Sequence, residues 1–262
     1  MTQTTAATSV ALSDDSSSAL KRYAAFGYGL TCYAVGVSGL VAMILATLGI
    51  LPFTGGPVQL ASTPTKIAFN LGLVALFGIQ HAIMARPAFK ERWTRIIHPA
   101  IERSTFTGLA GAIMGTLIWL WQPMPAMVWS VDSEGIALAL RGLCAFGWAY
   151  LLAATFAVDH FELFGVKQVW RNLRDLPTPP PNFKERLMYR FDRHPIMTGV
   201  AIGLWSTPSM TVGHLALALG FSAYIVLGVA LEERDLRRHH GARYADYARR
   251  VKTIVPRLSR DA

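Results

Sequence analysis

The feature that most constrains this chain is the length of its uncharged apolar segments. Residues 24–65 and 105–131 contain no charged side chain, and residues 195–231 contain no Asp, Glu, Lys or Arg. Apolar runs of about 18 residues or more are long enough to cross a bilayer as helices. Charged residues make up only 16% of the chain, whereas soluble domains average about 25%. The sequence therefore predicts a polytopic membrane protein and excludes a soluble enzyme and a disordered chain.

The apolar segments predict an all-α fold, a membrane helix bundle with about six hydrophobic segments. The segment 195–231 is too long for one crossing of about 20 residues. Thr207-Pro208-Ser209 divides it into a short fifth helix and a full sixth helix, which form a hairpin. The first four segments cover about 24–53, 67–85, 105–121 and 136–158.

The basic residues predict the orientation of this bundle. Nearly all of the 25 Lys and Arg precede the first segment or lie in 86–104, in 159–194 and from 232 onward. The alternate loops 122–135 and 209–213 contain none. By the positive-inside rule both termini are cytoplasmic, and we expect the bacterial inner membrane. Topology thus accounts for the net charge of +9, and no motif indicates nucleic-acid binding.

The remaining segments suggest one domain preceded by a tail. Residues 1–19 are polar and rich in Ser, Thr and Ala, which predicts a disordered tail, and 20–262 form a single membrane-embedded domain. Cys32 and Cys144 lie inside predicted spans and are expected to be small core residues. No metal site is expected, because the histidines form no convergent ligand set.

The first candidate binding motif is Arg193-His194-Pro195, with Gly199 one turn later. Proline suits the first turn of a helix, where its missing N–H has no intrahelical partner. Free backbone N–H groups there, together with Arg193, can bind a carboxylate or phosphate. Gly199 permits close approach of a ligand or of another helix.

The second motif is Glu232-Glu233, where the sixth helix leaves the membrane. Acidic residues at a helix C-terminus oppose its dipole, which suggests a use in binding. The predicted hairpin brings this motif next to His194 on the cytoplasmic side. Together the motifs suit a zwitterionic ligand that carries a ribose and an additional positive charge, and S-adenosyl-L-methionine is such a ligand.

The paired RHP and EE motifs resemble the isoprenylcysteine carboxyl methyltransferase and phospholipid methyltransferase superfamily. In that superfamily they bind S-adenosylmethionine, which implies a cofactor-binding part at about 159–250. Met197 stands where the family motif has an aromatic residue. The resemblance narrows to the bacterial methanethiol S-methyltransferase family along the segments 80–90, 102–105, 159–170, 193–195, 205–215 and 231–236. The segments 80–90 and 102–105 also resemble NnrU-type membrane proteins.

This resemblance, which covers about 67–256, implies methylation of methanethiol to dimethyl sulfide. A thiol is mostly protonated at neutral pH, so a base is expected nearby. His160, held by Asp159 or Glu162, is the first candidate, and a structural hydrogen bond is its alternative role. His81 and His194 are further candidates. His240 and Tyr244 are expected to close the cofactor site, unless this segment is an amphipathic helix on the lipid surface.

Two other functions remain open at this stage. One is a membrane methyltransferase acting on another thiol, a prenylcysteine carboxylate or a phospholipid amine. The other is a non-enzymatic NnrU-type membrane protein, which would not bind S-adenosylmethionine.

Overall fold

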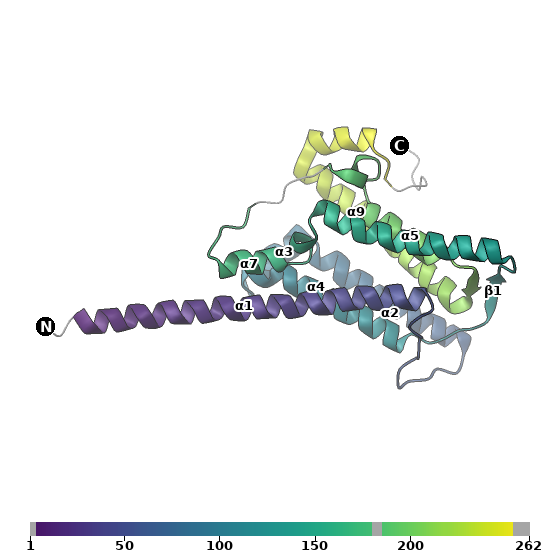
Figure 1. The fold of residues 1–262 in the computed structure, drawn as a ribbon, viewed down its shortest axis with the longest axis horizontal. Coiled ribbons are helices and arrows are strands. Elements are labelled where there is room, and N and C mark those ends of the chain that lie inside the picture. The colour runs from purple at the N-terminus through teal and green to yellow at the C-terminus, as the bar shows by residue number, and fades with distance from the viewer. Residues whose placement is uncertain (1–3, 180–184, 254–262) are drawn as a thin grey trace.

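A computed structural model describes residues 4–179 and 185–253, and the regular structure in these ranges is almost entirely helical (Figure 1). The longest helix is α1 (Thr4–Thr47). It begins inside the segment 1–19, for which the sequence predicts a disordered tail. The other elements are α2 (Thr63–Met84), α3 (Pro87–Trp93), α4 (Pro99–Leu120), β1 (Met127–Ser130), α5 (Glu134–Val158), α6 (His160–Leu163), α7 (Val166–Leu173), the 3-10 helix η1 (Leu187–Arg190), α8 (Pro195–Trp205), β2 (Ser209–Thr211) and α9 (Val212–Arg250).

Four helices are long and apolar enough to cross a membrane: Ser18–Thr47 of α1, α2, α5 and α9. The helix α8 is apolar but has only 11 residues. The 22-residue helix α4 carries Glu102 and Arg103 in its first turns and is not one of the four. The prediction of a helical membrane protein is confirmed, while the count of about six hydrophobic segments stays a prediction.

The helices α1 and α4 lie side by side with their backbones in contact (Figure 1). The contact depends on glycine, because a Cβ on Gly39 would overlap the backbone of Gly111. Small residues let membrane helices approach this closely. In Figure 1 the N-terminal part of α1 projects well beyond the rest of the bundle.

A second packing unit joins α5, α8 and α9. A Cβ on Gly199 of α8 would lie 2.6 Å from the carbonyl oxygen of Gly147 in α5, so these backbones also touch. After Trp205 the chain reverses, and β2 pairs antiparallel with β1, with Ser209 opposite Ser130. The reversal lies at the predicted Thr207-Pro208-Ser209 break, and α9 then returns alongside α8.

The last part of α9 folds back over the start of α8. Gly241 interrupts the helix with φ 52° and ψ −127°, a conformation that favours glycine. Beyond it, Tyr244, Tyr247 and Val251 form a buried cluster. The Tyr247 hydroxyl donates to the carbonyl oxygen of Tyr189 at 2.6 Å. The C-terminal segment thereby becomes a neighbour of η1 and of the RHP motif.

The outer faces of the long helices carry exposed apolar side chains. Leu138 is 68% exposed, Leu227 66% and Phe156 62%. An apolar surface of this extent marks an interaction with lipid or another partner. Together with the four candidate spans, it identifies an integral membrane protein.

Candidate active site

The candidate active site is a cavity of about 620 Å³ lined mainly by α1, α2, α4, α5, α8 and α9. Its depth is apolar and is lined by Phe77, Phe106, Met114, Trp148, Leu151, Val200, Leu204, Phe221 and Ile225. Its mouth is polar and is lined by Arg86, Lys90, Arg103, Tyr189, Arg193, His194, Glu232, Asp235, His239 and His240. The cavity can therefore hold a charged molecule at the mouth and a small apolar one at the depth.

The RHP and EE motifs meet at this mouth. Nε2 of His194 lies 3.2 Å from Oε1 of Glu233, and Nδ1 lies 3.5 Å from Oε2 of Glu232. The two glutamates differ in exposure: the Glu233 side chain is 11% exposed and the Glu232 side chain 48%. The structure thus brings the two motifs together, with Glu232 turned toward the cavity and Glu233 into the protein.

His194 is held in its charged form by these carboxylates. Burial alone would lower its pKa, but the hydrogen bonds and charges of Glu232 and Glu233 outweigh burial and raise the pKa to about 9. The neighbouring Asp192 is fully buried, and Oδ1 accepts the backbone N–H of His194 at 3.0 Å. Burial raises the pKa of Asp192.

Arg193 is occupied by partners from its own chain. Its Nε donates to Glu233 at 2.8 Å, and one Nη lies 2.7 Å from the same carboxylate oxygen. The other Nη donates to the carbonyl oxygens of Ala248 and Val251 at 2.8 and 2.6 Å. Nη2, the nitrogen that lies next to Glu233, also donates to the hydroxyl of Thr253. These contacts use all five N–H donors of a guanidinium, so Arg193 holds the C-terminal segment in place.

Pro195 and Gly199 serve helix geometry in this structure. Pro195 occupies the first position of α8, as the motif predicts. Gly199 permits close approach of a helix, which is one of the two expected roles, because its neighbours are Gly147 and Leu151 of α5. Met197 lines the cavity beside them.

His194 also lines the cavity, but its protonated form cannot act as a base, so His81 is the remaining candidate base in the lining. Its ring lies among Phe77, Phe106 and Tyr224, with centroid distances of 5.2, 4.7 and 6.1 Å. Its Nδ1 is buried and has no hydrogen-bond partner among the described residues. An unprotonated imidazole that lines an apolar cavity can accept a proton from a bound molecule.

His160 and Asp159 lie outside the cavity lining. His160 is hydrogen-bonded at both ring nitrogens, to the Tyr33 hydroxyl at 3.0 Å and to the Thr155 hydroxyl at 2.8 Å. Burial lowers its pKa. Asp159 accepts the backbone N–H of Glu162 at 3.2 Å and pairs with Lys167. These contacts support the structural role that the sequence analysis left open for His160.

Of the two site residues expected in the C-terminal segment, one lines the cavity and the other does not. His240 lines the mouth of the cavity, whereas Tyr244 is 1% exposed and belongs to the buried cluster beneath Arg193. Lys90 and Arg103 line the mouth from α3 and α4 but are not among the site residues that the sequence predicts. Their basic character was visible, but topology explained it fully, and no spacing rule linked them to the RHP motif.

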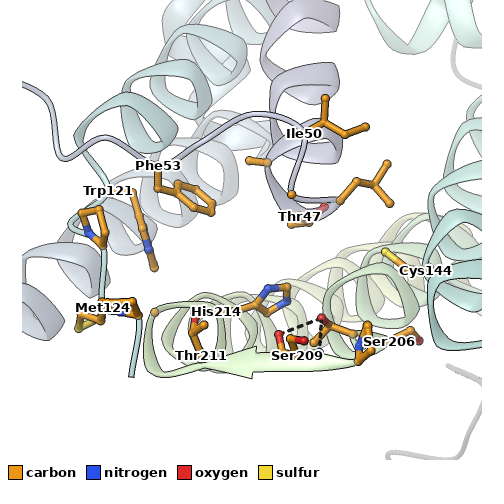
Figure 2. A pocket seen from close by; sticks show the side chains of 18 of the residues that line it. Thr47, Ile50, Phe53, Trp121, Met124, Cys144, Ser206, Ser209, Thr211 and His214 are labelled. Atoms are coloured by element: carbon orange, nitrogen blue, oxygen red, sulfur yellow. Dashed lines mark hydrogen bonds between the residues drawn. The ribbon is translucent and has the colours of Figure 1, made fainter. Parts of the chain in front are cut away.

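A second cavity, of about 570 Å³, lies at the opposite end of the bundle, next to the β1–β2 ribbon. Figure 2 shows His214 between Trp121 and Cys144, with Thr47 and Ile50 facing it across the pocket. Nε2 of His214 lies 2.7 Å from the carbonyl oxygen of Leu204. The described lining contains Arg141 but no carboxylate, so this cavity lacks the paired charges of the first one.

Comparisons with known proteins identify relatives along most of the chain. It is 40% identical over 241 residues to methanethiol S-methyltransferase of Mycobacterium tuberculosis, an alignment that covers 90% of this chain and 98% of that protein. It is 39% identical to methanethiol S-methyltransferase 1 of Bradyrhizobium diazoefficiens, covering 90% and 83%. Nurim of Rattus norvegicus is 28% identical, covering 72% and 79%. No protein-family profile and no solved structure matches the chain.

Proposed function

The chain belongs to the methanethiol S-methyltransferase family, and from this premise we propose that it transfers a methyl group from S-adenosyl-L-methionine to methanethiol. The products are dimethyl sulfide and S-adenosylhomocysteine. The observation that carries the proposal is the first cavity, in which a charged mouth opens directly into an apolar depth. A zwitterionic donor suits the mouth, and a small apolar thiol suits the depth.

The residues at the mouth fit S-adenosylmethionine. Glu232 is half-exposed and lines the cavity, so its carboxylate can accept hydrogen bonds from ribose hydroxyls or pair with the ammonium group. His240 lines the same mouth and can contribute a further polar contact. When bound, S-adenosylmethionine supplies an electrophilic methyl group on a positively charged sulfur.

The buried members of the two motifs act as positioning residues. Arg193 and Glu233 form an ion pair at 2.7 Å with side chains that are 8% and 11% exposed. His194 connects this pair to Glu232. The network fixes the start of α8 against α9 and the C-terminal segment, and so fixes where Glu232 stands.

His81 is the proposed general base. It takes the proton of the thiol, whose sulfur then forms a bond to the methyl carbon as the sulfonium carbon–sulfur bond breaks. The negative thiolate and the positive sulfonium give neutral products, so charge is lost along the reaction. Apolar walls that exclude water favour this direction, because water would stabilise the separated ions.

The orientation is proposed on the same basis. The cavity mouth lies on the side of the basic segments 86–104 and 232 onward. The positive-inside rule makes this side cytoplasmic, which is where S-adenosylmethionine is made available in a bacterium. Methanethiol is small and apolar and partitions into the bilayer, so it can reach the apolar depth from lipid.

The experiment is an acceptor panel with the purified full chain in detergent. Methyl-labelled S-adenosylmethionine is supplied with methanethiol, a prenylcysteine, phosphatidylethanolamine or no acceptor, and labelled products are identified by mass spectrometry. Label in dimethyl sulfide is the expected result. Label in the prenylcysteine or the phospholipid instead would transfer the activity to those acceptors, and label in no product would leave the non-enzymatic alternative.

A further inference from the structure

Part of the lining of the first cavity is basic. Arg86 precedes α3, Lys90 lies within α3 and Arg103 lies in the second turn of α4, and all three line the cavity. Three cations therefore line the same cavity as Glu232 and Asp235, the acidic residues of α9. In the sequence these cations indicate the orientation of the chain and lie in segments that carry the family resemblance, but no pattern assigns them a ligand.

One of the three cations is paired, and the other two are not. Arg86 donates to Oδ2 of Asp235 at 2.8 Å. Nε of Arg103 donates to the carbonyl oxygen of Leu163 at 2.5 Å, and its guanidinium carbon lies 4.6 Å from the centroid of Phe106. The backbone N–H and carbonyl of Lys90 are hydrogen-bonded within its helix, but its ammonium has no hydrogen bond or ion pair within the described ranges. The Lys90 ammonium and the Nη donors of Arg103 are thus available to an anion.

Nearby acidic side chains form no ion pair with Lys90 or Arg103 among the described residues. Glu102 is close enough to influence Lys90 and Arg103, but it forms no ion pair within 4.0 Å among the described residues and does not line the cavity. Glu232 pairs with His194 across the mouth. Burial and the charge of Arg103 lower the pKa of Lys90. An anion between the two cations would offset this repulsion.

Arg193 and the start of α8, where the sequence predicts a carboxylate site, already bind groups of the protein itself. The donors of Arg193 are used by Glu233 and the C-terminal segment. The start of α8 faces the buried carboxylate of Asp192, which accepts the N–H of His194. A ligand carboxylate placed there would have to displace these internal partners.

We propose that Lys90 and Arg103 bind the α-carboxylate of the methionine part of S-adenosylmethionine. This inference rests on the proposed function. It gives a binding partner to the donor's carboxylate, for which the RHP motif has no unused hydrogen-bond donor on Arg193. The basic part of the lining binds the carboxylate while Glu232 binds a positive or hydroxyl-bearing part of the donor. Together they select a zwitterion and disfavour donors that lack the carboxylate.

The test compares two ligands that differ only in this group. Binding of S-adenosylmethionine and of decarboxylated S-adenosylmethionine is measured by displacement of labelled S-adenosylhomocysteine, without an acceptor, in the wild type, Lys90→Gln and Arg103→Gln. The control is Arg95→Gln, which removes one exposed charge from the same basic segment but does not line the cavity. A charge-assisted hydrogen bond contributes about 1.5–3 kcal/mol, or roughly 10-fold to 100-fold in affinity.

The expected result is a wild-type preference for the carboxylated donor that falls about 10-fold or more in Lys90→Gln and stays unchanged in Arg95→Gln. Arg103→Gln also loses the contact with Leu163, so Lys90→Gln is the deciding variant. An unchanged preference in Lys90→Gln would overturn the inference and assign these cations to another anion, such as a lipid phosphate. Failure of the wild type to bind S-adenosylhomocysteine at all would instead overturn the proposed function.

Discussion

Nε2 of His194 lies 3.2 Å from Oε1 of Glu233, although 39 residues separate them in the chain. This contact joins the first residue before α8 to the point where α9 leaves its apolar part. Both helices contribute to the cavity on one side of the contact, and the C-terminal segment packs on the other. The geometry of the cavity mouth therefore depends on charges that are buried beneath it.

The charge of His194 predicts a loss of stability at alkaline pH. Its pKa in the folded protein is about 9, above the ordinary value of 6.5. The contribution of the protonated form is fully present below pH 6.5 and is lost as the pH rises through 9. The pKa difference corresponds to roughly 3 kcal/mol. We expect the apparent Tm in detergent, followed from pH 6 to pH 10, to fall across this window.

The matched variant is His194→Asn, which cannot carry the charge. It should start at a lower Tm at pH 6 and lose less of it between pH 6.5 and 9. An equal alkaline loss in both proteins would attribute the pH dependence to other groups.

Replacing Arg193 with Lys should destabilise the protein. An ammonium cannot supply the planar set of five donors that now connects Glu233, Ala248 and Val251. Disrupting a buried ion pair costs about 3–5 kcal/mol. The measurement is the Tm together with the rate of tryptic cleavage in the C-terminal segment, and both should change.

Arg237→Lys is the control for this substitution. Arg237 pairs with the same Glu233 at 3.2 Å, but its side chain is 61% exposed. Exposed pairs contribute about 1 kcal/mol or less, so the Tm should barely change. Equal effects of the two substitutions would contradict the assigned role of Arg193.

His81 and His160 should respond differently to replacement with Ala. Loss of a general base lowers turnover by about 100-fold or more, and we expect this for His81→Ala with S-adenosylhomocysteine binding retained. His160→Ala removes hydrogen bonds to Tyr33 and Thr155 and should lower the Tm more than the rate. Initial rates and Tm values of both variants decide between them. A selective loss of turnover in His160→Ala would identify His160 as the base instead.

Gly199→Ala should disrupt the packing of α8 against α5. The new Cβ would lie 2.6 Å from the carbonyl oxygen of Gly147 and 2.7 Å from the backbone nitrogen of Leu151. Overpacking of this kind costs about 1–3 kcal/mol. Gly142→Ala, where nothing lies within 4 Å, is the control and should leave the Tm unchanged or slightly raised. Two equal Tm values would refute the contact.

The sequence predicts the parts of this fold that depend on local physics. The apolar segments predicted at about 24–53, 67–85 and 136–158 match candidate spans, and Thr207-Pro208-Ser209 locates the reversal between α8 and α9. The same reversal predicts that His194 and Glu232 are neighbours, because a hairpin returns the chain to the face where it began.

The roles of individual site residues depend on contacts that local patterns do not encode. Arg193 satisfies its donors on a segment that reaches it only because Gly241 adopts a positive φ. His160 is held by Tyr33, which lies 127 residues away in the chain. Lys90 and Arg103 join the site because α3 and α4 pack beside α2, which also packs against α9. Such relationships require the packed bundle.

The most direct test is headspace gas chromatography of dimethyl sulfide from purified protein supplied with S-adenosylmethionine and methanethiol. Ala110→Phe fills the apolar depth of the first cavity, and Ser209→Phe makes a matched change in the second. Dimethyl sulfide from the wild type and Ser209→Phe, with little from Ala110→Phe, is the predicted result. No dimethyl sulfide from the wild type, or its loss only in Ser209→Phe, would contradict the account.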